Sequence, residues 1–146
     1  MRVHAAIARQ EVTVKVAELM RTTLKTIAAD ATVVDAVTAL TQARVSALPV
    51  LDRFGRALGV LSTREILKAE RGLRSPRARD KLFQETPIHE IMAPWPETIA
   101  PDADVRDAAR EMLYLEVQRL FVEEEGALVG VISQTDIVAA VATAKV

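Results

Sequence analysis

The stretch ELMRTTLKTIAADATVVDA, residues 18–36, recurs 72 positions later as EIMAPWPETIAPDADVRDA, residues 90–108. Ten of the 19 aligned residues are identical, which indicates a tandem duplication rather than a coincidence of composition. After a one-residue shift in a loop, the match continues from GVLSTREI at 59–66 to GVISQTDI at 130–137. The chain is therefore built from two copies of a unit of about 55 residues.

Each copy shows the same order of expected elements. Apolar residues spaced i, i+3, i+4 and i+7 predict a helix after Asp30 and another after Asp102. Two short apolar runs separated by a glycine-containing turn then predict a β-hairpin in each copy. These runs lie at 47–51, 57–62, 119–123 and 128–133. A helical pattern resumes directly after each hairpin and predicts a closing helix.

The repeat unit is too small to be stable alone, because it would bury too little apolar surface. We therefore expect an α/β protein in which two repeats pack about a pseudo-twofold axis. The expected divisions are an N-terminal extension at 1–15, the first repeat at 16–69, a connecting segment at 70–87 and the second repeat at 88–146.

The composition excludes several classes of protein. Of the 146 residues, 50% are hydrophobic and 27% are charged, which favours a globular fold over a disordered chain. Aromatic residues make up only 3%, and the net charge is -1, so nucleic-acid binding is not expected. We interpret the local basic cluster as a solvated linker or helix face. Its members are Arg71, Arg74, Arg77, Arg79 and Lys81.

A cytoplasmic location without membrane contact is expected from three features. The chain has no cysteine, which suits a reducing compartment. No apolar run reaches the ~18 residues of a membrane span, and the N-terminus lacks the apolar region of a signal peptide.

Catalysis is not expected. The two histidines, His4 and His89, do not have metal-ligand spacing, and no serine lies in a G-x-S-x-G context. Asp102 and Asp104 are most simply interpreted as helix caps. We therefore predict a protein that is not an enzyme and has no catalytic residue or metal site.

The repeated motifs resemble the CBS domain, and two in tandem resemble a CBS pair, or Bateman module. The resemblance rests on T-I-A-x-D-A-x-V, V-x-x-L-x-V and G-V-[IL]-S-x-x-[DE]-I, and it covers 16–69 and 88–141. It implies β-α-β-β-α repeats, a homodimer formed through helical faces, and adenosine-containing ligands such as AMP, ADP or ATP in the clefts between repeats. It also implies a stand-alone regulatory module that acts through the homodimer or on a partner protein in trans.

The resemblance also implies site residues in the second copy. Ser133, Thr135 and Asp136 are expected at the ribose, because an aspartate can accept hydrogen bonds from both hydroxyls of the diol. Arg119 is expected near the phosphates. The walls around adenine and sugar would come from Thr22, Thr23, Val45, Ser46, Ala47 and Ile132.

The equivalent cleft of the first copy is expected to be weak or empty. Its glutamate, Glu65, is one methylene longer than Asp136 and would overshoot a ribose. The residues assigned to this cleft are Ser62, Arg64, Glu65 and Gln118. No cofactor is required, and if ATP binds, we expect Mg2+ to travel with its phosphates.

Alternatives stay open for these residues. SQTD at 133–136 and STRE at 62–65 both satisfy the capping-box pattern, which is compatible with ligand binding. Arg119 could instead form a surface ion pair with Glu116 or Glu123. The rival to a ligand-binding function is a ligand-free structural or protein-interaction module. Trp95 would then anchor a partner, although partial burial over the sheet edge also explains it.

Overall fold

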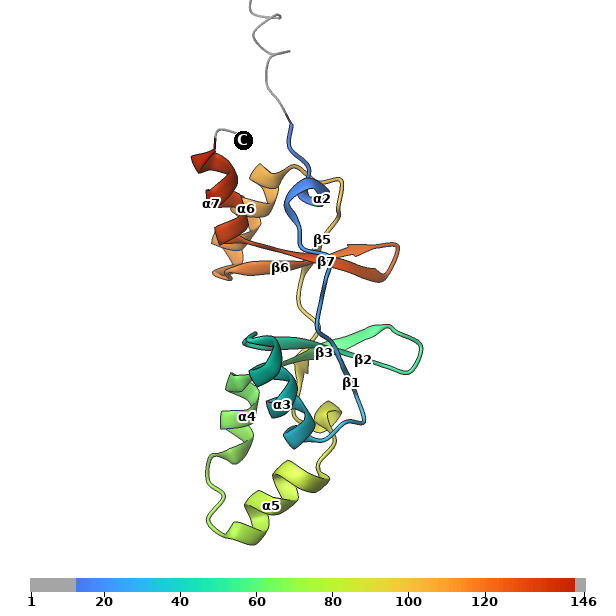
Figure 1. Ribbon diagram of the computed structural model, residues 1–146, viewed down its shortest axis with the longest axis vertical. Coiled ribbons are helices and arrows are strands. Elements are labelled where there is room, and N and C mark those ends of the chain that lie inside the picture. The colour runs from blue at the N-terminus through green and yellow to red at the C-terminus, as the bar shows by residue number, and fades with distance from the viewer. Residues whose placement is uncertain (1–12, 144–146) are drawn as a thin grey trace, which may run out of the picture. The chain divides into compact units, whose positions relative to one another are not determined.

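The computed structural model describes residues 13–143 as a mixed α/β protein that divides into two compact units (Figure 1). Unit 2 comprises Leu24–Pro96, and unit 1 comprises the rest of the chain. Each unit holds one hairpin-containing sheet, so the predicted α/β class with two repeats is confirmed. Packing of the repeats about a pseudo-twofold axis stays a prediction. The predicted extension at 1–15 lies almost wholly outside the described residues.

Unit 2 is a four-stranded sheet with its helices on one face (Figure 1). The strand order is β1-β2-β3-β4, with β1 parallel to β2 and the other pairs antiparallel. The strands are β1 Ile27–Ala28, β2 Ala47–Leu51, β3 Ala57–Ser62 and β4 Ala93–Pro94. The helices are α3 Val33–Ala43, α4 Thr63–Glu70, α5 Pro76–Glu85 and the 3-10 turn η1 Ile88–Glu90.

Unit 1 repeats this plan with a three-stranded sheet. The strand order is β5-β6-β7, with β5 parallel to β6 and β6 antiparallel to β7. The strands are β5 Thr98–Ile99, β6 Arg119–Glu124 and β7 Ala127–Ser133. The helices are α2 Val16–Leu19, α6 Val105–Leu115 and α7 Gln134–Ala142.

The helices begin where the sequence places capping side chains. Thr32, Ser62 and Ser133 are the N-caps of α3, α4 and α7, and each forms a capping box with the acidic residue three positions later. The side chain of Asp104 accepts a hydrogen bond from the backbone of Arg106 at 2.8 Å at the start of α6. These contacts confirm the predicted caps at Ser62, Ser133 and Asp104 and satisfy N–H groups that the first helical turn leaves unpaired. The prediction that Asp102 also caps this helix was wrong, because α6 begins only after Asp104, two residues further along the chain.

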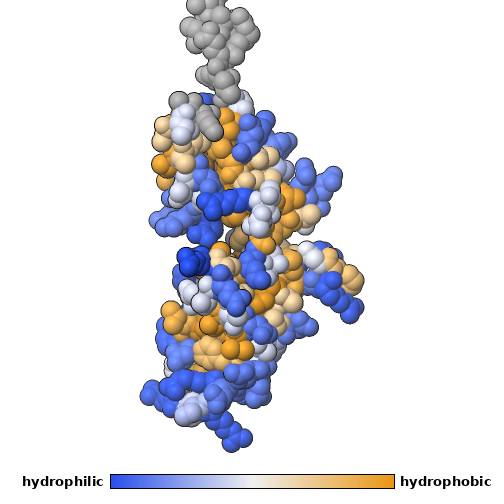
Figure 2. Space-filling model, viewed as in Figure 1, coloured by the Kyte–Doolittle hydropathy of each residue, from blue (hydrophilic) through white to orange (hydrophobic). Residues whose placement is uncertain are grey.

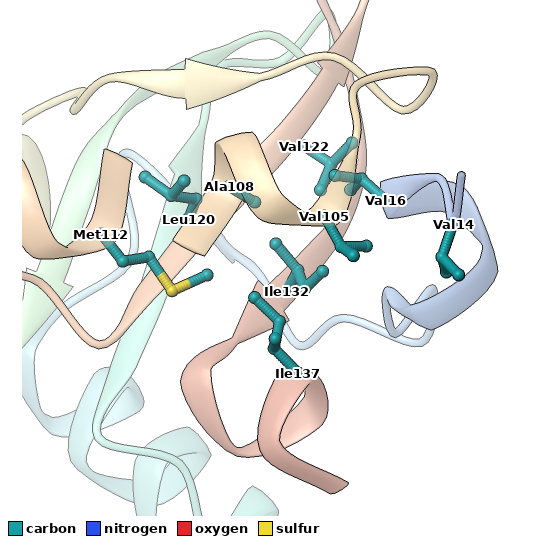
Figure 3. Close-up of a cluster of buried hydrophobic side chains, with 9 residues drawn as sticks. All are labelled: Val14, Val16, Val105, Ala108, Met112, Leu120, Val122, Ile132 and Ile137. Carbon is teal, nitrogen blue, oxygen red and sulfur yellow. The ribbon is translucent and has the colours of Figure 1, made fainter. Parts of the chain in front are cut away.

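The core of unit 1 includes residues from the segment that leads into the first copy. Val14 and Val16 are buried in the same cluster as Val105 and Val122, and Val16 lies next to Val122 (Figure 3). This leading segment is thus built into the compact unit of the second copy. The relation is reciprocal, because Ile88 is fully buried in the core of unit 2.

Two buried glycines show how these leading segments are held. A Cβ on Gly130 would lie 2.7 Å from the sulfur of Met20 and 2.9 Å from the carbonyl oxygen of Arg21. A Cβ on Gly59 would similarly lie 2.4 Å from the carbonyl oxygen of Ala93. Each glycine therefore permits the leading segment of the other copy to cross the second hairpin strand closely.

The connecting segment is itself ordered as α5. Ser75 caps it and Pro76 occupies its first turn, a combination that favours a helix start. Leu82 is buried in the unit 2 core, while the five residues of the basic cluster are exposed. Hydrophilic residues cover this end of the unit in the view of Figure 2, as expected for a solvated helix face.

Candidate functional site

Asp136 is the best-organised acidic side chain at the predicted site. It lies in the first turn of α7, and its side chain is only 12% exposed. Its Oδ2 accepts a hydrogen bond from the backbone N–H of Ser133 at 2.9 Å, and the Ser133 hydroxyl accepts one from the backbone N–H of Asp136 at 3.1 Å. The capping box therefore fixes the orientation of the carboxylate.

Arg21 is a second partner of this carboxylate, and sequence analysis did not find it. Its Nε donates to Oδ1 of Asp136 at 3.3 Å across 115 positions of sequence. The duplication held a signal, since Arg21 aligns with Ala93 directly after the matched methionines of the two copies. The next four positions also differ between the copies, TTLK at 22–25 against PWPE at 94–97, so this difference alone did not single out Arg21.

The carboxylate of Asp136 keeps capacity for a ligand. An ionised carboxylate offers about four acceptor positions, two on each oxygen. Among the described residues, one position on Oδ2 is taken by Ser133 and one on Oδ1 by Arg21. One acceptor position remains on each oxygen, which is the arrangement that two vicinal hydroxyls require.

Other predicted residues of the second copy lie close to this start of α7. Arg119 pairs with Ser133 in the antiparallel register of β6 and β7, so the two side chains share a face of the sheet. Arg119 is exposed, and it forms no ion pair within residues 13–143. The alternative pairing with Glu116 or Glu123 is therefore not present.

The remaining predicted residues of unit 1 differ in exposure. Thr22, Thr23 and Thr135 are exposed. The carbonyl oxygen of Gln118 accepts a hydrogen bond from the backbone N–H of Gln134 at 2.9 Å, which places Gln118 at the start of α7. Ile132 is fully buried in the unit 1 core, so it can contribute to an adenine wall only through its backbone.

The first copy holds its glutamate differently. Oε1 of Glu65 accepts hydrogen bonds from both the backbone N–H and the hydroxyl of Ser62. In the described part of the chain, Glu65 has no arginine partner, because Ala93 occupies the position equivalent to Arg21. The two closing helices therefore begin with carboxylates of different length, pairing and local charge.

The predicted residues of unit 2 surround the start of α4. The backbone N–H of Thr63 donates to the carbonyl oxygen of Ser46 at 3.3 Å. Val45 and Ser46 are exposed and Ala47 is half-buried. Arg64 lines a surface groove of about 350 Å³ along α4. Its other lining residues are Thr63, Leu67, Lys68 and Arg71. Contact of Val45, Ser46 and Ala47 with a ligand at Asp136 stays a prediction.

The described residues contain no cluster of three or more histidine or acidic side chains that could hold a metal ion. Within residues 13–143, no helix has the length and apolar character needed to cross a membrane. Trp95 is half-buried and directly follows the edge strand β4, and its role as an anchor for a partner stays a prediction.

Comparison with known proteins identifies both copies. The family model of the CBS domain matches residues 16–72 and again residues 88–143. The A-adding tRNA nucleotidyltransferase of Aquifex aeolicus is 29% identical over 139 residues, which is 95% of this chain. The chain spans only 16% of that enzyme's length.

Solved structures give the same fold. The AcuB protein from Vibrio cholerae is 27% identical, with a TM-score of 0.76 over 91% of this chain and 93% of that protein. CBSX2, whose crystal structure was determined in complex with AMP, is 26% identical, with a TM-score of 0.74 over 90% of this chain and 98% of CBSX2. Both comparisons cover nearly the whole of each chain.

Proposed function

Because the chain belongs to the CBS domain family, we propose that it is a regulatory module that binds an adenosine-containing ligand at Asp136. One observation carries the proposal: the carboxylate of Asp136 is oriented by Ser133 and Arg21 and has one acceptor position left on each oxygen. A ribose diol supplies two adjacent hydroxyl donors with matching spacing. The crystal structure of CBSX2 with AMP supports this class of ligand.

The phosphate end of the ligand would lie toward Arg119. This exposed guanidinium pairs in register with Ser133 and offers a planar, permanently charged set of donors. Within unit 1, Thr22 and Thr23 would contribute to the walls around sugar and adenine, while a contribution of Val45, Ser46 and Ala47 stays a prediction. If ATP is the ligand, its phosphates would coordinate Mg2+, because phosphate oxygens are hard ligands for this ion.

The site at Asp136 would bind more tightly than the site at Glu65. The Glu65 carboxylate directs both of its hydrogen bonds with Ser62 to one oxygen. Its longer side chain and the absence of an arginine at position 93 give it a different reach and charge. Occupancy of the Glu65 site would therefore require a higher ligand concentration.

Signalling would pass through a homodimer or a partner protein. In unit 1, α6 exposes Leu113 and Tyr114 at 72% and 83%, and α7 exposes Val138 and Val141 at 64% and 56%. Large apolar side chains this exposed favour a protein interface. This face supports the homodimer that CBS pairs form through their helices. A cytoplasmic location stays a prediction.

A thermal-shift titration with AMP, ADP, ATP and S-adenosylmethionine tests the proposal. A ligand present at about 100 times its Kd stabilises the folded chain by about 2.7 kcal/mol. The Asp136→Ala variant should lose this stabilisation, and Asp136→Asn should lose most of it while retaining a side-chain oxygen as cap. Glu65→Ala is the matched control, because it removes the equivalent capping-box residue from the other copy.

The outcomes separate the two functional hypotheses. Stabilisation of the wild type and of Glu65→Ala, but not of Asp136→Ala, supports the ligand site. Equal stabilisation of all variants would place the ligand elsewhere. No shift with any of the four compounds at millimolar concentration would favour the structural or protein-interaction module.

A further inference from the structure

We propose that Arg21 makes the Asp136 site selective for adenosine ligands that carry negative charge on the 5′ substituent. The inference rests on the proposed function and names the ligand class within it. It assigns to Arg21 the role of a specificity-determining residue, acting through its permanent charge beside the carboxylate that receives the ribose.

The backbone of Arg21 is built into the sheet of unit 1. Its N–H donates to the carbonyl oxygen of Val131 at 2.8 Å, and its carbonyl oxygen accepts from the N–H of Val131 at 3.0 Å. Val131 lies in β7, two residues before the Ser133 cap of α7. The side chain of Arg21 therefore starts from a position fixed to the strand that leads directly to Asp136.

The guanidinium has most of its donors left for a ligand. Arginine has five N–H donors and is not deprotonated in proteins. Within the described chain, one donor of Arg21 is used, by Nε on Oδ1 of Asp136 at 3.3 Å. The Arg21 side chain is 71% exposed, while that of Asp136 is 12% exposed. The Arg21 guanidinium, with its free donors, is therefore exposed to solvent, while the Asp136 carboxylate that it contacts is largely buried.

A ribose bound to Asp136 would lie next to this charge, because both would contact the same carboxylate. The 5′ substituent of the same sugar is then subject to the field of Arg21. A 5′-phosphate can accept charge-assisted hydrogen bonds from the free N–H donors of Arg21. The 5′-hydroxyl of adenosine gains little, and the sulfonium of S-adenosylmethionine is repelled.

The first copy has no arginine at the equivalent position. The aligned residue is Ala93, whose backbone pairs with Val60 just as that of Arg21 pairs with Val131. The backbone arrangement is therefore the same in the two copies, while the charge is present in only one. Selection by 5′ charge should accordingly be a property of the Asp136 site alone.

Isothermal titration of AMP, adenosine and S-adenosylmethionine into three proteins tests the inference. The proteins are the wild type, Arg21→Ala and Arg110→Ala. Arg110 provides a matched control, because it also forms an exposed arginine–aspartate ion pair in unit 1, with Asp107 on α6. Unchanged circular dichroism and melting temperature would establish that the variants fold.

We expect Arg21→Ala to weaken AMP binding about tenfold, which corresponds to one charge-assisted hydrogen bond. Adenosine should bind within about twofold of wild type, and S-adenosylmethionine should bind about twofold more tightly because a like charge several ångströms away is gone. Arg110→Ala should leave all three affinities unchanged. A further variant, Arg21→Lys, should retain the preference for AMP.

An unchanged ratio of AMP to adenosine affinity in Arg21→Ala would overturn the inference while leaving the proposed function intact. Parallel weakening of all three ligands would also overturn it, because Arg21 would then shape the site rather than select charge. If the wild type binds none of the three compounds, the proposed function itself fails, and this inference fails with it.

Discussion

Replacement of Gly130 by alanine should break the contact that builds the first copy's leading segment into unit 1. The added Cβ would lie 2.7 Å from the sulfur of Met20 and 2.9 Å from the carbonyl oxygen of Arg21. The methionine side chain can move, but the carbonyl oxygen belongs to a backbone pair with Val131. The variant must therefore shift the segment or strain β7.

The cost follows from these two contacts. Overpacking a closely packed position costs about 1 to 3 kcal/mol, and a lost backbone hydrogen bond adds about 0.5 to 1.5 kcal/mol. We expect Gly130→Ala to lower the free energy of unfolding by about 3 kcal/mol. With a urea m-value of about 1 to 3 kcal/mol/M, the midpoint should fall by about 1 to 3 M.

Urea unfolding followed by far-UV circular dichroism measures this loss, with Gly126→Ala as the control. Gly126 has a φ of +82°, and no atom lies within 4 Å of the place that an added Cβ would occupy, so alanine there costs only its left-handed strain, about 1 to 2 kcal/mol. Amide exchange of Arg21 and Val131 should accelerate in Gly130→Ala alone. A Gly130→Ala variant no less stable than Gly126→Ala would refute the reasoning.

Three further predictions concern single side chains. Ser133→Ala should lower the free energy of unfolding by about 1 kcal/mol through loss of the α7 cap, measured by urea unfolding, and a neutral result would contradict the capping role. Met112→Ala should cost about 2 to 5 kcal/mol, because Met112 is fully buried in unit 1; calorimetry would show a lower melting temperature, and an unchanged one would exclude this packing. The backbone N–H of Arg56, followed by that of Phe54 and the Arg56 side chain, lowers the pKa of Asp52 below its ordinary 3.8. The stabilisation of this turn is thus present above pH 3.8 and is lost as the pH falls through the lower pKa of the folded chain; a titration midpoint for Asp52 at or above 3.8, followed by NMR, would contradict it.

The elements that could be predicted from the sequence are those fixed by local patterns. The strands β2 at 47–51 and β3 at 57–62 have the predicted bounds, because each is an apolar run ended by a turn or a cap. The capping boxes at Ser62 and Ser133 were also predicted, since a box depends on residues only three positions apart. Because the chain is duplicated, each of these patterns occurs in both copies, which strengthens the prediction.

The helix α5 was missed although its start was encoded. Gly72 and Pro76 made the segment at 70–87 resemble an irregular connection. Proline in the first turn after a serine cap is nevertheless a helix-start signal, and Leu82 gives the helix its buried contact with the core of unit 2.

The reciprocal placement of the leading segments could not be predicted, because it depends on contacts between distant parts of the chain. Arg21 and Ala93 contribute only short bridges to β7 and β3, which leave no periodic pattern in the sequence. The same limitation hid the Arg21 to Asp136 ion pair, whose partners are 115 positions apart. The predicted ligand residues could be identified from the resemblance to the family. The residues that contact them, such as Arg21, could be identified only from the three-dimensional structure.

The most direct test of the central claim is the affinity of the wild type for AMP against 2′-deoxy-AMP, measured by isothermal titration. If both free acceptor positions of Asp136 receive ribose hydroxyls, loss of the 2′-hydroxyl should weaken binding about tenfold, since the bond is made to a charged group. Asp136→Asn should reduce this discrimination. Equal affinity of the wild type for AMP and 2′-deoxy-AMP would contradict recognition of the ribose diol by Asp136.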